Sequence, residues 1–194
     1  NQAKAASPPR RIASIPQKGP HFLTAFFILY ASQILSIVLD GNHRAVLRTD
    51  EKDFYNQLVE VRKEVGDRAI LRAIHLFNEN KRVEKAVSSL KNNDFDTFRQ
   101  VIKNSGDSSY KYLQNVYSNK YPDNQAVSLA LALSEGILEN HGVCRVHGGG
   151  FAGTIQAFVE DEYVDHYKEE IEKYFGEGSC HVLKVRKFGG MKVL

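Results

Sequence analysis

The stretch His147-Gly148-Gly149-Gly150-Phe151-Ala152-Gly153 is a glycine-dense turn between two runs that are typical of strands, 143–146 and 154–159. Glycine loses the most conformational entropy in regular structure, so a cluster of it indicates tight turns, positive φ or the close approach of a ligand. Successive N–H groups on such a loop can converge on one anion. The pattern alone leaves two interpretations open: a loop that binds phosphate, and a hairpin whose glycines only let the strands turn.

The known phosphate-loop patterns of nucleotide-binding proteins do not fit this turn. No Lys-Ser or Lys-Thr pair follows Gly153, and the segment after it has the pattern of a strand where those loops continue into a helix.

Composition places the chain among ordinary globular proteins. It has 194 residues, of which 42% are hydrophobic and 25% charged, enough for one domain with a full core. The net charge of +3, without a basic stripe, argues against a nucleic-acid partner. Cys144 and Cys180 lie far apart and outside any metal-type spacing, so we expect a reduced, cytoplasmic protein with both cysteines in the core and no metal site.

Residues 1–45 form a segment of their own. Residues 1–20 combine Pro, Ala, Ser and two adjacent arginines, which indicates an extended arm. The run 22–39 is uncharged over the length that a membrane helix needs, so a signal anchor and a buried segment are both consistent with it. We favour burial in the protein and expect no membrane partner.

The remainder, 46–194, reads as helices followed by strands. Helical periodicity begins near Asp50, is interrupted at Gly66, and resumes until the Asn92-Asn93 pair. We expect Ser108 or Asp107 to cap a further helix, and the mostly apolar helix around 126–138 to be central and buried. After residue 142 the pattern becomes strand, loop, strand, helix and strand, which predicts an α+β fold.

The sequence also resembles a known family. Arg145 to Thr154 is similar to the third, C-terminal glycine motif of the GHMP small-molecule kinases, and Phe151 inside the cluster points to the galactokinase branch. Residues 67–83 are similar to a basic helix of galactokinases that ends in Asn-x-Arg-Val, and 105–109 stand where that family has a serine-containing helix start. The resemblance covers about two-thirds of the chain.

The resemblance implies a function and a fold. The parent protein would be a galactokinase that transfers the γ-phosphoryl group of ATP, with Mg²⁺, to the anomeric hydroxyl of galactose. Residues 46–194 would form its ferredoxin-like C-terminal domain with additional helices. The residues carried over as nucleotide-site-forming, and not as catalytic, are Gly148, Gly149, Gly150, Phe151, Ala152 and Gly153. Ala152 stands where Gly is usual and His147 where Thr is common.

Several parts of the family pattern are absent. The sugar-binding motif, the ATP loop and the segment with the catalytic Asp belong to an N-terminal domain, so we expect the fragment to be inactive without that partner. A homodimer through exposed apolar surface is a further expectation. The alternatives are a ferredoxin-like regulatory module that binds a small ligand, and another GHMP kinase of the heptose or mevalonate type.

Overall fold

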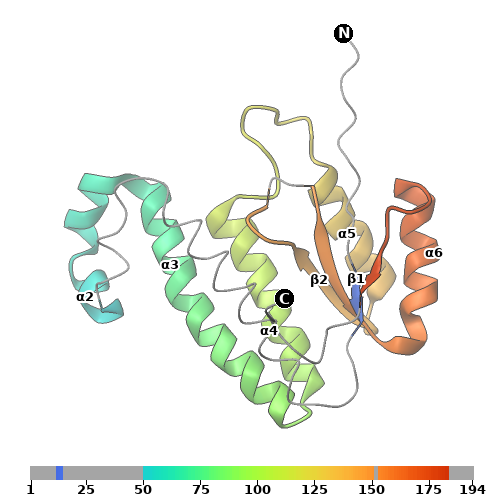
Figure 1. The fold of residues 1–194 in the computed structure, drawn as a ribbon. Helices are drawn as coiled ribbons and strands as arrows, with labels where there is room; N and C mark the ends of the chain where they lie inside the picture. The colour runs from blue at the N-terminus through green and yellow to red at the C-terminus, as the bar shows by residue number, and fades with distance from the viewer. Residues whose placement is uncertain (1–11, 15–49, 151–152, 184–194) are drawn as a thin grey trace, which may run out of the picture.

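The computed structural model describes residues 12–14, 50–150 and 153–183 (Figure 1). The elements are, in chain order, β1 (Ile12–Ser14), α2 (Glu51–Asn56), α3 (Leu58–Lys91), α4 (Phe95–Ser108), the π-helix η2 (Ser109–Leu113), α5 (Ala126–Leu138), β2 (Gly142–Val146), β3 (Ile155–Val159), the 3₁₀ turn η3 (Asp161–Tyr163), α6 (Val164–Phe175) and β4 (Val182–Leu183). Most of the arm 1–20 and the apolar run 22–39 lie outside the described residues.

The strands form one mixed sheet in the order β2-β3-β1-β4. β2 and β3 are an antiparallel hairpin in which Cys144 pairs with Ala157 and Arg145 with Gln156. β1 pairs in parallel with both β3 and β4. The predicted α+β class is therefore confirmed.

Helices cover both faces of the sheet, α3 and α4 on one side and α5 and α6 on the other (Figure 1). Because strand side chains alternate between faces, Val143 of β2 faces α4 whereas Cys144 faces α5 and α6. The buried apolar residues between the sheet and α3 and α4 are Ala86, Phe98, Val101, Ile102, Val143 and Phe158. Those on the opposite face are Leu138, Cys144, Ala157, Val159, Val164, Tyr167, Ile171 and Cys180.

The predicted break at Gly66 is present as a kink inside α3, where Gly66 has φ +77° and ψ 168°. A left-handed φ of this kind is accessible to glycine at little cost. Phe54 of α2, before the kink, packs with Ile70 and Ala73 of α3, after the kink, in a small separate core.

Two expectations about helices hold only in part. Ser108 ends α4 and stands at the N-cap position of the π-helix η2, as predicted, but its side chain makes no capping hydrogen bond and no separate helix begins there. Helix α5 is less buried than its composition predicted, because Leu129 is 54% exposed while Ala130 and Leu138 lie in the core.

Among the described residues, no helix combines the length and apolarity that crossing a bilayer requires. The run 22–39, for which the sequence left a signal anchor and a buried segment open, lies outside the described residues.

Candidate functional site

The glycine turn, defined here as residues 147–154, connects β2 to β3. The His147 N–H donates to the carbonyl oxygen of Thr154 at 3.1 Å and so closes the hairpin. Gly148, Gly150 and Gly153 have φ values of +67°, +74° and +74°, in the left-handed region that side chains with a Cβ disfavour. The turn therefore has a backbone shape that requires glycine at three of its positions.

Gly149 and Gly150 differ sharply in their surroundings. A Cβ on Gly150 would lie 2.0 Å from the carbonyl oxygen of Asn115, so the backbone of another segment presses directly against it. A Cβ on Gly149 would meet no atom of the described residues within 4 Å, and the residue is exposed. One side of the turn is thus packed against the protein, and the other is open to a ligand.

A hollow of about 210 Å³ lies beside the turn at Gly153. Its remaining lining comes from the segment after η2 and the start of α5, namely Val116, Tyr117, Ser118, Tyr121, Asn124, Ala126 and Val127. The turn thus borders a hollow with both aromatic and polar walls.

Between the sheet and helices α3 and α4 is a group of ionic and hydroxyl side chains, all buried except the partly buried Arg82, named here the buried polar cluster. It consists of His75, Glu79, Arg82, Ser105, Ser108 and Arg145. Helix α3 supplies His75, Glu79 and Arg82, and each of these lies one helical turn from the next along one side of the helix.

Glu79 is the centre of the cluster and is only 1% exposed. One carboxylate oxygen accepts from Arg82 Nε at 2.7 Å, and the other accepts a short hydrogen bond from the Ser105 hydroxyl. The same Ser105 Oγ accepts from Arg145 Nη1 at 2.8 Å, and that nitrogen lies 3.8 Å from Glu79. A carboxylate buried this deeply is stable only with such charged and hydrogen-bonding partners.

Ser108 closes the other side of the cluster. Its hydroxyl accepts from Arg82 Nη2 at 2.9 Å and is 2.9 Å from His75 Nδ1. Burial, together with the positive charges of Arg82 and Arg145, lowers the pKa of His75 to about 3, so the imidazole is neutral at physiological pH. Burial also lowers the pKa of Arg145, against the opposing effect of Glu79.

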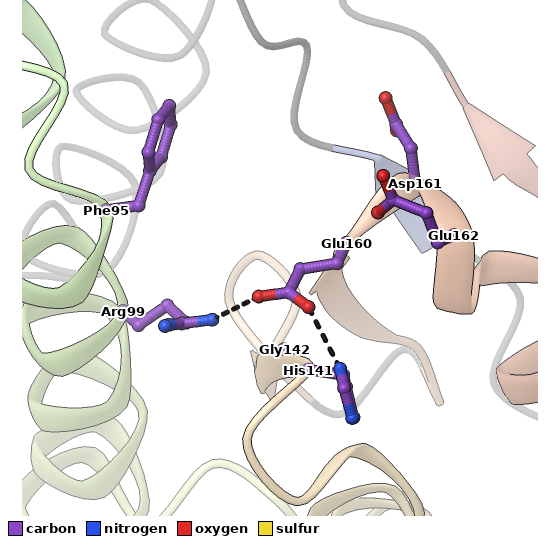
Figure 2. A pocket seen from close by; sticks show the side chains of 7 residues that line it. All are labelled: Phe95, Arg99, His141, Gly142, Glu160, Asp161 and Glu162. Carbon is purple, nitrogen blue, oxygen red and sulfur yellow. Dashed lines mark hydrogen bonds and ion pairs between the residues drawn. The ribbon is translucent and has the colours of Figure 1, made fainter.

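A second hollow, of about 190 Å³, lies at the other end of the β2–β3 hairpin (Figure 2). There Glu160 accepts from Arg99 Nη1 at 2.7 Å and contacts His141 Nδ1 at 2.9 Å. Figure 2 shows Glu160 between these two side chains. Phe95 lies on the same helix as Arg99, across the opening from Asp161 and Glu162. Arg99 therefore pairs with two carboxylates, Glu160 in the hollow and Asp96 on its own helix.

The structure brings together four of the six residues that the sequence singled out, Gly148, Gly149, Gly150 and Gly153, in one turn. Phe151 and Ala152 lie outside the described residues. Whether the turn is a nucleotide site stays a prediction.

The buried polar cluster was not recognised in the sequence. Arg145, Glu79 and Ser105 lie in three separate stretches, for which the sequence predicts a strand, a helix and a helix start but no contact between them. The polar residues His75, Glu79 and Arg82, spaced along one side of a helix, were the available signal.

The cysteines are core residues, as predicted. Cys144 and Cys180 are both free and buried, and burial raises the pKa of each thiol to about 12. Within 12–14, 50–150 and 153–183, no group of three or more His, Cys, Asp or Glu side chains could hold a metal ion.

Three curated galactokinases are similar to the chain. That of Clostridium acetobutylicum is 36% identical over 107 residues, 55% of this chain and 25% of that protein. That of Actinobacillus pleuropneumoniae is 33% identical over 103 residues, 53% and 25% of the two chains. That of Thermotoga neapolitana is 30% identical over 131 residues, 67% and 35%. No protein-family model matches the chain.

The chain is therefore galactokinase-like over the greater part of its length. The aligned region spans only about a quarter to a third of each of these relatives.

Proposed function

We propose that the chain is the C-terminal domain of a galactokinase-like sugar kinase. The parent protein would transfer the γ-phosphoryl group of ATP to the anomeric hydroxyl of galactose. The similarity to galactokinases supports this proposal, and the glycine turn is the structural observation that carries it.

Two features of the turn support its assignment to a phosphate group. Gly149 is exposed with open space around its α-carbon, while the contact of Gly150 with Asn115 holds the turn in place. Fixed N–H groups stabilise phosphate charge with no reorganisation cost at the moment of transfer. We assign Gly148, Gly149, Gly150, Phe151, Ala152 and Gly153 to the phosphate end of the nucleotide site as residues that shape it.

Mg²⁺ is assigned elsewhere in the parent protein. The described residues hold no cluster of acids suited to a metal, so no part of the metal chemistry is placed on them. What this domain would do is position the nucleotide, which is the main demand of phosphoryl transfer.

We propose further that residues 46–194 form a ferredoxin-like domain whose sheet also takes in strand β1 (Ile12–Ser14) of the preceding segment. The strand order β2-β3-β1-β4 supports this fold, and the parallel pairing of β1 does not. Its partner would be the N-terminal part of the kinase, and the location cytoplasmic. Large apolar side chains are exposed on several described elements, including Val59 at 65% and Leu129 at 54%, which would suit a covering domain or a second copy.

Two other functions would use the same turn differently. A regulatory module would bind its small anion without any second domain. A heptose or mevalonate-type kinase would keep the ATP site and bind a different phosphate acceptor in place of galactose.

The first test is activity. The purified 194-residue chain, freed of host kinases, should release no ADP from ATP in the presence of galactose. A preparation that joins the chain to the N-terminal part of a galactokinase relative should do so. Galactose-dependent turnover by the chain alone would contradict the fragment assignment.

The second test separates a phosphate site from a simple hairpin. Gly149→Val adds a side chain where there is open space and no positive φ, so the melting temperature should change little while kcat/KM for ATP falls in the joined protein. Gly150→Ala is the matched control, because its Cβ would meet the Asn115 carbonyl and cost about 2 kcal/mol or more of stability. If kcat/KM per folded molecule is unchanged by Gly149→Val, the turn is only a hairpin.

A further inference from the structure

We infer that the buried polar cluster positions the glycine turn from both of its sides, which makes Ser105 and Arg145 positioning residues for an anion bound at the turn. The anion-binding part of this inference rests on the proposed function. The positioning part rests on contacts alone.

The first connection runs through strand β2. Arg145 is 7% exposed, donates to Ser105, and is separated from Gly148 only by Val146 and His147. Helix α4 also lies against this residue with its backbone: a Cβ on Gly106 would be 3.0 Å from the Cβ of Arg145. Arg145 is held both by a directional hydrogen bond and by a close contact with the α4 backbone. These two contacts fix the position of strand β2 relative to α4 at the point where the strand leads into the turn.

The second connection runs through the end of α4 and the segment after it. Ser108 belongs to the cluster, and the next residue, Ser109, donates its hydroxyl to Asn115 Oδ1 at 3.1 Å. The carbonyl of Asn115 then faces Gly150 at the distance that excludes a Cβ. The far side of the turn is thus in contact with a segment that the same helix end orients.

Stability alone does not account for an ionic cluster at this place. Apolar side chains of the same volume would hold α3, α4 and β2 together at equal or lower cost, because burying charges carries a large desolvation penalty. What hydrogen bonds add to packing is direction, and here the directed groups lead to two places on one loop, its start after Val146 and Gly150.

The test compares two buried serines in the 194-residue chain. Ser105→Ala removes the hydroxyl that joins Arg145 to Glu79, whereas Ser134→Ala removes one of similar burial that bonds only to Tyr167 on the other face of the sheet. Both should lower the melting temperature. Only Ser105→Ala should move the amide resonances of Gly148, Gly149 and Gly150 in a ¹H–¹⁵N spectrum and speed their hydrogen exchange.

Gly106→Ala is the second variant, and it keeps every polar group. Alanine favours the helix, but its Cβ displaces Arg145, so the glycine amides should move even if the melting temperature does not fall. This variant keeps the inference testable if Ser105→Ala fails to fold.

The same spectra are then titrated with ATP and with inorganic phosphate. Ser105→Ala should raise the dissociation constant of the probe about two- to tenfold, and Ser134→Ala should leave it unchanged. If the glycine amides respond equally to both serine variants, or to neither Ser105→Ala nor Gly106→Ala, the positioning role is refuted. If they respond as expected but neither probe binds the wild-type chain, the positioning stands and the phosphate assignment fails.

Discussion

The two faces of strand β2 hold it by different physical means. Cys144 and Val146 point into apolar cores formed with helices α5 and α6 and the segment before α5. Arg145, one position along, points the other way into bonds with Ser105 and near Glu79. One strand thus has an apolar side and, at Arg145, a side held by directed ionic contacts.

This difference indicates on which face substitutions should cost little stability and on which face they should cost much. Apolar packing is non-directional, so apolar substitutions that conserve volume cost little. A buried ionic group has no substitute once its partner is removed, because the charge left behind cannot reach water. The glycine turn follows Arg145, which lies on the face held by ionic contacts. Mutations on each face can therefore measure the two contributions separately.

The largest effect should follow from removing the centre of the cluster. Glu79→Ala leaves the buried Arg145 and the partly buried Arg82 without their carboxylate, and the free energy of unfolding should fall by about 3–5 kcal/mol. Urea unfolding measures it. Glu135→Ala, which removes an exposed carboxylate that pairs with Lys103 at 3.4 Å, is the control and should cost less than about 1 kcal/mol. Equal losses in the two variants would contradict the central role of Glu79.

A pH dependence should appear on the polar face and not on the apolar one. The pKa of His75 is lowered from 6.5 to about 3 in the folded chain. Between these values the unfolded state binds a proton that the folded state does not, so stability decreases as pH falls below about 6.5, by up to about 1.4 kcal/mol per unit.

His75→Gln should flatten that slope between pH 6.5 and 4 in urea unfolding. His166→Gln, which changes an exposed histidine on α6, should leave the slope as it is in the wild type. An unaltered slope in His75→Gln would show that other groups cause the acid sensitivity.

The smallest effect belongs to the apolar face, where two buried hydroxyl groups form a hydrogen-bonded pair. Ser134 Oγ and Tyr167 Oη are 2.6 Å apart, and Tyr167→Phe should cost about 1–2 kcal/mol because it leaves the serine hydroxyl without that partner. The double variant Ser134→Ala/Tyr167→Phe should regain part of the loss. Additive losses in the double-mutant cycle would mean that the pair contributes no coupling.

Local patterns predicted the local features well. The hairpin around the glycines, the break at Gly66 and the helix end at Asn92-Asn93 are all present. Each depends on backbone preferences of a few neighbouring residues, which a sequence displays directly.

Features that depend on long-range neighbours were predicted poorly. Ser108 has the side chain of a helix cap, yet the structure uses its hydroxyl to join Arg82 and His75. Leu129 has the side chain of a core residue, yet no described element covers it. In both cases the residue type was read correctly and its partner was unknown.

The sequence by itself determined that this is an α+β, galactokinase-like chain with a turn that needs glycine, because periodicity, residue type and motif spacing are properties of neighbouring residues. Only the tertiary structure decided that Gly149 is open while Gly150 is packed, since Asn115 is 35 positions away in the chain. It alone also gathered Glu79, Ser105 and Arg145 into one cluster. A buried charge is stable only with a partner, because its desolvation is costly. That partner can come from any segment that the fold places beside it, so a local sequence pattern does not identify it.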